Sequence, residues 1–199
     1  MRRSVMFDHV SADGYFASTD GNLDWVGSDP ELDRASAGSL TEFDTMLLGR
    51  RTYEMFESFW PNALADSGSA PDPHHPDARS PQLHAIAVWI NEQQKLLVSS
   101  SRQNVTWNNS RILPRMDPDE IRALKRQPGK DIIVFGSGSI VSALTQHDLI
   151  DEYQFIVNPV ILGNGRSMLT GVAQRASLGL IESRTYVSGK ILLRFGRRG

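Results

Sequence analysis

Residues 131–139 read DIIVFGSGS, a continuous apolar run that ends in a turn with two glycines. Residues 43–54 read FDTMLLGRRTYE and repeat this design. Each segment predicts a buried strand, a tight turn at the glycine and a helix directly after it. Continuous apolar strands between helices are typical of a sheet that is covered on both faces. The two segments therefore predict an α/β fold.

Helix-start signals extend this pattern along the chain. Residues 28–31 (SDPE) and 117–120 (DPDE) each place a capping side chain before a proline at the first helical position. We expect these helices to run to about residue 38 and residue 128. Residues 82–94 predict another helix, and 95–99 a buried strand. A first strand within residues 1–10 should lead into a long irregular loop.

The last third of the chain changes character. Residues 153–160 and 178–195 read as strands without helices between them, and residues 187–190 (VSGK) resemble a tight hairpin turn. They predict a mixed, mainly parallel central sheet with antiparallel C-terminal strands. Residues 60–81 are rich in proline and predict an irregular surface insertion, so we expect a single domain over residues 1–199.

Composition excludes several classes of protein. The chain has 21 Lys+Arg against 23 Asp+Glu, which argues against nucleic acid or an anionic membrane surface as a partner. It has no cysteine and hence no disulfide or thiolate metal site. No apolar stretch approaches the length of a membrane span or a signal peptide. We therefore expect a cytoplasmic protein. Apolar residues at 191–193 and 195 need cover on a sheet edge or face, which favours a homodimer.

The two glycine turns are the best candidates for chemistry. A strand, a glycine and a helix start aim free backbone amides and the positive end of the helix at one point, which suits a phosphate. Gly49 permits close approach, while Arg50 can grip a phosphate with its planar guanidinium. Glycines after strands also occur merely because helices pack there. Two such turns at neighbouring strand ends favour a dinucleotide over that alternative.

The order of short motifs resembles the dihydrofolate reductase superfamily. The motifs are SADG at 11–14, GNLDW at 21–25, LGRRTYE at 48–54, LVSS at 97–100 and VFGSGS at 134–139. The segment NPVILGNGR at 158–166 is similar to the reductase domain of the bifunctional riboflavin-biosynthesis deaminase/reductase and its stand-alone relatives. This resemblance implies a three-layer α/β/α fold of the dihydrofolate reductase type that binds NADPH.

The resemblance also implies roles for individual residues. Arg50 would reach the 2′-phosphate of NADPH and Thr52 the pyrophosphate. Phe16 and Leu23, on a mobile flap at residues 13–25, would neighbour the nicotinamide. The remaining cofactor-binding residues that it implies are Gly49, Ser99, Ser100, Gly136, Ser137, Gly138 and Ser139.

On the substrate side the resemblance is less direct. Asp33 matches the pterin-binding carboxylate of dihydrofolate reductases by spacing alone, and a solvated helix residue is the alternative. Trp25, Gly163 and Arg166 are expected to face the substrate, with Arg166 suited to a sugar phosphate. The implied activity is reduction of 5-amino-6-(5-phosphoribosylamino)uracil. Alternatives are reduction of a pterin, or a non-catalytic sensor that binds NADPH.

Three histidines are weaker candidates. His74 and His75 lie in the proline-rich insertion, where two adjacent histidines are expected to be surface residues and not metal ligands. No metal site is therefore expected. His9 lies in the first strand and is expected to be a buried structural histidine, with a proton relay beside the nicotinamide as the alternative.

Overall fold

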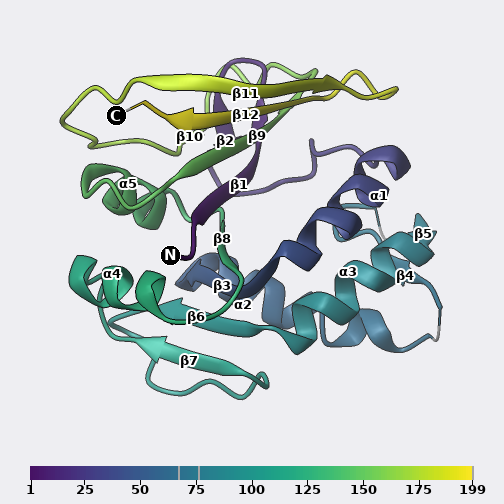
Figure 1. Ribbon diagram of the computed structural model, residues 1–199. Coiled ribbons are helices and arrows are strands. Elements are labelled where there is room, and N and C mark those ends of the chain that lie inside the picture. The colour runs from purple at the N-terminus through teal and green to yellow at the C-terminus, as the bar shows by residue number, and fades with distance from the viewer. Residues whose placement is uncertain (67, 76, 199) are drawn as a thin grey trace.

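An eight-stranded sheet forms the centre of the protein (Figure 1). The computed structural model describes residues 1–66, 68–75 and 77–198. From one edge to the other, the strands are β11 (Leu178–Thr185), β12 (Ile191–Arg197), β9 (Glu152–Asn158), β1 (Ser4–Ser11), β8 (Asp131–Phe135), β3 (Phe43–Gly49), β6 (Gln94–Val98) and β7 (Ser110–Leu113).

Most of the sheet is parallel. The pairs formed by β9, β1, β8, β3, β6 and β7 are all parallel, whereas β12 is antiparallel to β9 and β11 is antiparallel to β12. The mixed, mainly parallel sheet with antiparallel C-terminal strands is thus confirmed. The turn between β11 and β12 is the expected hairpin, with Gly189 at φ 83° and the Tyr186 amide donating to the Lys190 carbonyl (2.9 Å).

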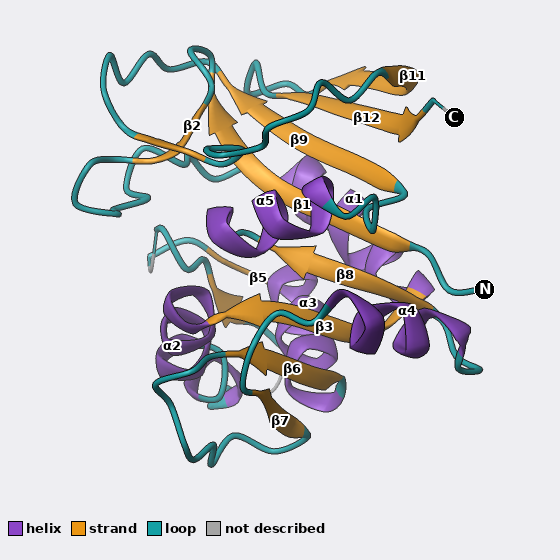
Figure 2. Ribbon diagram, turned by 90° about the vertical axis from the view of Figure 1, so that its left-hand side faces the viewer, coloured by secondary structure: helices purple, strands orange, loops and turns teal. Residues whose placement is uncertain are grey.

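Helices cover both faces of the sheet (Figure 2). On one face, α4 (Pro118–Arg126) and α5 (Gly138–Gln146) share an apolar core with Leu47 and Val134. On the other face, α3 (Pro81–Glu92) shares a second core with Leu48 and Ile133, and α1 (Pro30–Ser39) packs beside α3. Successive strand residues therefore face opposite cores, which explains the continuous apolar runs of the sequence.

The helix starts confirm the capping signals. Asp29 Oδ1 accepts hydrogen bonds from the Glu31 and Leu32 amides (2.9 and 3.0 Å), and α1 begins at Pro30. Asp117 caps α4 in the same way through the Asp119 amide (3.0 Å). None of the helices in the described part of the chain is long and apolar enough to cross a membrane.

Three segments differ from the expectations. β7 was not expected, because SRIL is short and only half apolar, and β7 lies at the sheet edge. The loop after β1 is not wholly irregular, since β2 (Tyr15–Ala17) pairs with β10 (Arg166–Ser167). The insertion at 60–81 contains a 3₁₀ turn (Asn62–Leu64) and the short pair β4 (Ala70–Pro71) and β5 (Arg79–Ser80). Ala70 and Asp72 of this insertion are buried, so the insertion is more than a surface loop.

Candidate functional site

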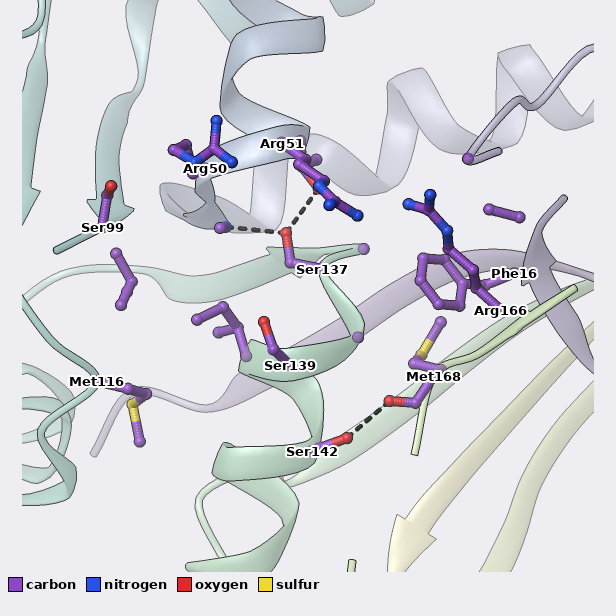
Figure 3. Close-up of a pocket in the computed structure, with 18 of the residues that line it drawn as sticks. Phe16, Arg50, Arg51, Ser99, Met116, Ser137, Ser139, Ser142, Arg166 and Met168 are labelled. Atoms are coloured by element: carbon purple, nitrogen blue, oxygen red, sulfur yellow. Dashed lines mark hydrogen bonds between the residues drawn. The ribbon is translucent and has the colours of Figure 1, made fainter. Parts of the chain in front are cut away.

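The two glycine turns meet at the carboxyl ends of β3 and β8. The Gly49 amide donates to Ser137 Oγ (2.9 Å), and Ser137 Oγ also lies 2.6 Å from Thr52 Oγ1 (Figure 3). A Cβ atom at Gly49 would lie 2.7 Å from Ser137 Oγ, closer than real contacts allow. Glycine at position 49 is therefore required for this contact between the turns.

Both helices that leave these turns have free N-termini. The N-caps of α2 (Arg50–Phe59) and α5 are Gly49 and Ser137, and neither makes a side-chain capping bond among the residues described. Gly136 and Ser137 both adopt left-handed backbone conformations (φ 48° and 61°). Uncapped amides at two converging helix starts form a site for phosphate groups.

Asp8 lies directly behind this turn. Its Oδ2 is shielded from solvent and has no hydrogen-bond partner in the described chain, and it would lie 3.5 Å from a Cβ atom at Gly136. Burial raises the pKa of the Asp8 carboxyl group to about 8. Asp8 is therefore mostly protonated at neutral pH and does not oppose an anion at the turns.

A large cavity of about 1130 Å³ opens over the two turns. Its lining includes four arginines, and none of the described residues that line it is a carboxylate. The arginines are Arg50, Arg51, Arg115 and Arg166. Such a surplus of positive charge beside two helix N-termini favours a ligand with several phosphate groups.

The two ends of the large cavity differ in chemistry (Figure 3). One end has Ser99, Ser100, Ser101 and Met116 near Arg50. At the other end Phe16, from β2, packs against the start of α5, where a Cβ at Gly138 would lie 3.1 Å from Phe16 Cε1. The Met168 carbonyl also lies beside Gly138, 3.2 Å from the position of a Cβ atom there. This carbonyl accepts a hydrogen bond from Ser142 Oγ (2.8 Å). The β2–β10 ribbon thus covers one end of the large cavity.

A small cavity of about 460 Å³ lies on the α1 side of the sheet. Much of its wall is aromatic, from Phe7, Phe43, Phe56, Phe59, Trp60 and Phe135. Asp33 of α1 also lines it. Burial and the nearby charge of Asp72 raise the pKa of the Asp33 carboxyl group to about 6. The small cavity therefore suits a flat ring that meets a carboxyl group able to hold or release a proton near neutral pH.

Basic side chains from distant segments also line the small cavity. His9 comes from β1, His74 from the insertion and Lys190 from the β11–β12 hairpin. Lys190 is only 3% exposed, and its Nζ donates to the Gly27 carbonyl. The expectation that His74 is a surface residue is wrong, since it is half-buried and burial lowers its pKa.

The two cavities adjoin. Leu23, from the loop after β2, and Met55, from α2, line both of them. A ligand group at the flap end of the large cavity is therefore adjacent to a ring in the small cavity. This arrangement suits transfer of a group between two bound molecules.

Most residues singled out from the sequence line a cavity. The large cavity contains Phe16, Leu23, Gly49, Arg50, Thr52, Ser99, Ser100, Gly136, Ser137, Gly138, Ser139 and Arg166. Asp33 lines the small cavity, so it is not merely a solvated helix residue. Arg50 is paired with Glu54 (3.0 Å), and a phosphate would have to compete with this exposed ion pair.

Of the three residues expected to face the substrate, two lie outside both cavities and one lines the large cavity. Trp25 and Gly163 line neither cavity: Trp25 Nε1 donates to the Asn22 carbonyl (3.3 Å), and the Gly163 amide donates to Asp13 Oδ2 (2.7 Å). Arg166 lines the large cavity and not the small one, and its Nε donates to the Thr19 carbonyl (3.1 Å).

Sequence reasoning missed several lining residues. Arg51 and Met55 could have been found, since both lie on the helix that begins at the first glycine turn. Ser101 continues the serine run after β6. No local sequence pattern predicts that Lys190 and His74 line a cavity, because they meet only when the hairpin and the insertion fold over α1.

Comparisons with known proteins agree with this architecture. The model of the RibD C-terminal domain matches residues 5–192. The uncharacterized protein YyaP of Bacillus subtilis is 27% identical over 191 residues, which are 96% of this chain and 92% of YyaP.

Solved structures share the fold at lower identity. A protein from Shewanella sp. PV-4, named for riboflavin biosynthesis, has a TM-score of 0.74 at 19% identity, with 99% of both chains covered. A diaminohydroxyphosphoribosylaminopyrimidine deaminase/5-amino-6-(5-phosphoribosylamino)uracil reductase from Thermotoga maritima has a TM-score of 0.66 at 12% identity, covering 99% of this chain and 57% of that one.

The same fold extends to dihydrofolate reductase. The enzyme from Enterococcus faecalis, complexed with NADP(H) and RAB-propyl, has a TM-score of 0.58 at 11% identity. The match covers 99% of this chain and 97% of the enzyme's chain. The dihydrofolate-reductase-like fold expected from the motifs is thus confirmed. Since the family model spans almost all of the sheet and both glycine turns, this chain belongs to the RibD C-terminal domain family.

Proposed function

We propose that the protein is an NADPH-dependent reductase of a small heterocyclic molecule. The observation that carries this proposal is the junction at Leu23 and Met55 between two chemically different cavities. One is rich in arginine and built on helix N-termini, and the other is aromatic and contains the carboxyl groups of Asp33 and Asp72. A nucleotide and a flat ring bound in these cavities would lie side by side.

The residues of the large cavity fit NADPH. The uncapped starts of α2 and α5 would hold the pyrophosphate, with Thr52 and Ser137 supplying hydroxyl groups. Arg50 and the serines after β6 would hold the 2′-phosphate, which favours NADPH over NADH. Phe16 and Leu23 would border the nicotinamide and exclude water from it. When bound, NADPH supplies a hydride to an electron-poor carbon of the substrate.

In the small cavity Asp33 is the residue proposed to handle the proton. With a pKa of about 6 it is partly protonated near neutral pH and can give a proton to the atom next to the reduced carbon. A non-catalytic sensor would need no acid beside the nicotinamide, so this position of Asp33 favours turnover.

For the physiological substrate we propose a phosphoribosylamino-pyrimidine of the type reduced in riboflavin biosynthesis. Membership in the RibD C-terminal domain family supports it. No arginine is among the described residues of the small cavity, so the sugar phosphate would extend beyond that cavity. Reduction of a pterin is the second candidate, supported by the Asp33 carboxyl group and the ring-sized cavity.

The test is cofactor binding followed by turnover. Titration of the protein with NADPH and NADH, followed by the quenching of tryptophan fluorescence, should give tighter binding of NADPH. NADPH oxidation at 340 nm should then require 5-amino-6-(5-phosphoribosylamino)uracil, with dihydrofolate as the comparison substrate. Binding of NADPH without oxidation by either compound would support the sensor, and no binding of NADPH would reject the proposal.

We also propose a homodimer that uses the β11 edge of the sheet. The edge strand is β11 and not β12, and Leu180 and Ile181 on β11 are 59% and 54% exposed. Apolar side chains on an exposed edge strand favour pairing with a second copy. Light scattering at micromolar concentration should give twice the chain mass of 22.1 kDa, and a monomer would refute this proposal.

A further inference from the structure

The small cavity has a hydrogen-bond donor side that the reduction chemistry does not explain. His9, His74 and Lys190 line it together, although they come from three segments far apart in the chain. They are close enough for charge on Lys190 and His74 to act on the pKa of His9. The role of this donor side in binding a ring rests on the proposed function.

His9 presents a neutral ring with a defined proton. Burial first, and then the charges of Lys190 and His74, lower the pKa of His9 to about 3. Its Nδ1 lies 3.3 Å from Nδ2 of Asn158, and the same Nδ2 lies within 3.2 Å of the carbonyls of Val10 and Ile156. The two carbonyl contacts identify this atom as the amide nitrogen, which cannot accept a hydrogen bond, so a proton on His9 Nδ1 would face a donor. The His9 proton is therefore on Nε2, which makes Nε2 a donor.

Lys190 adds a buried ammonium group. Its Nζ makes one hydrogen bond within the described chain, to the Gly27 carbonyl, whereas an ammonium group has three donors. Burial lowers the pKa of Lys190, and the charges of Asp29, Asp33 and Asp72 act in the opposite direction. Since Lys190 is only 3% exposed, its remaining donors face the interior and require an acceptor.

His74 is held in place by the backbone of its turn. Asp72 Oδ1 accepts from the amides of His74 and His75 (2.7 and 3.0 Å). His75 Nε2 lies 3.0 Å from the Val26 carbonyl, which ties the turn to the segment before α1. The His74 ring makes no hydrogen bond to another residue within the described ranges. This leaves its ring nitrogens available to a ligand in the small cavity.

We propose that His9, Lys190 and His74 are specificity-determining residues that bind the carbonyl oxygens of a pyrimidinedione ring. Asp33 binds the amino groups of the same ring. A ring with both carbonyl and amino groups offers acceptors to these donors and donors to Asp33. A ring with amino groups in place of the carbonyl groups offers only its ring nitrogens, so donors of Lys190 beyond its bond to the Gly27 carbonyl lack carbonyl acceptors. Leaving buried donors of an ammonium group without acceptors is unfavourable.

The test compares two probes of similar size by isothermal titration calorimetry. The probes are 5,6-diaminouracil, which has two carbonyl groups, and 2,4,6-triaminopyrimidine, which has none. Each is titrated into the wild-type protein and its variants, with and without saturating NADPH. The wild type should bind 5,6-diaminouracil about tenfold or more tightly than triaminopyrimidine.

Substitution should remove this preference selectively. Lys190→Met is expected to weaken 5,6-diaminouracil about tenfold or more while it changes triaminopyrimidine less than about twofold. Lys190→Arg should restore part of the loss. His74→Leu and His9→Leu should act in the same direction, and they provide the test if Lys190→Met does not fold. Lys130→Met, at an exposed lysine that lines neither cavity, is the matched control.

The outcomes separate this inference from the proposed function. Equal loss of both probes in the folded variants, or no binding of either probe to the wild type, would overturn the ring preference. NADPH titration of the same proteins tests the reductase proposal by itself, because none of the three residues lines the large cavity. A protein that binds no NADPH but keeps the ring preference would reject the reductase and retain this inference.

Discussion

The large and small cavities share Leu23 and Met55 but are built in different ways. The large cavity is centred on two turns, each made by a single continuous stretch of chain after a strand. The small cavity takes its charged residues from β1, α1, the 60–81 insertion and the last hairpin. The main features of the large cavity are therefore local in the sequence, whereas the charged side chains of the small cavity are brought together only by the fold.

The largest effect should come from Asp33, because it lines the small cavity and is the residue that we propose as the proton donor. We expect Asp33→Asn to lower the rate of NADPH oxidation by about 10²- to 10⁴-fold while NADPH binding stays unchanged. In the wild type, the rate should fall as the pH rises through about 6, where the carboxyl group loses its proton. The variant should lack this pH dependence.

Stopped-flow oxidation of NADPH between pH 5 and 8 measures both effects. The mutation is nearly isosteric, so a melting curve controls for stability. An unchanged rate, or the same pH dependence in Asp33→Asn, would show that the proton comes from another group.

The next effect tests the contact between the glycine turns. Gly49→Ala places a Cβ atom 2.7 Å from Ser137 Oγ and 3.2 Å from Ile140 Cγ1, which forces the turns apart. We expect NADPH to bind about a hundredfold more weakly, equivalent to about 3 kcal/mol. Gly38→Ala on α1 is the control, since a Cβ atom there meets nothing within 4 Å.

Fluorescence titration with NADPH compares the two glycine variants. Equal, near-wild-type affinity in both would mean that the contact between the turns does not organise the large cavity. Binding of 5,6-diaminouracil in the absence of NADPH should be unchanged in Gly49→Ala, because the small cavity does not use this turn.

A smaller and selective effect is expected at Arg50. Arg50→Ala should weaken NADPH about tenfold and NADH less than about twofold, since only NADPH has the 2′-phosphate. The effect is limited because Arg50 must first leave its exposed ion pair with Glu54. Titration with both nucleotides gives the ratio, and an equal loss for NADPH and NADH would assign the 2′-phosphate to another residue, with Arg51 or Arg115 as the next candidates.

The smallest effect concerns the flap at the junction of the cavities. Phe16→Ala should lower the single-turnover rate of hydride transfer about tenfold or less, while binding of the adenosine half of NADPH stays close to wild type. Phe16 is only partly buried beside the apolar core, so the loss of stability should be modest. A lower melting temperature with an unchanged hydride rate would identify Phe16 as a packing residue alone.

The sequence by itself was sufficient to predict most strands of the central sheet, the helix starts and most of the large cavity. Leu47 and Leu48 face opposite cores, so a sheet covered on both faces appears in the sequence as an unbroken apolar run. Gly49 and Gly136 stand where a strand passes into a helix, and their conformational demands are local. Such signals involve neighbours in the chain and can be recognised without the fold.

Only the tertiary structure determined which charged residues come together in the small cavity. Lys190 stands in a hairpin that looked like an ordinary turn, and His74 in an insertion that looked like surface. The fold buries both beside His9 and Asp33, and burial is what shifts their pKa values. Charge and desolvation depend on which distant segments come together. No spacing along the chain encodes that arrangement.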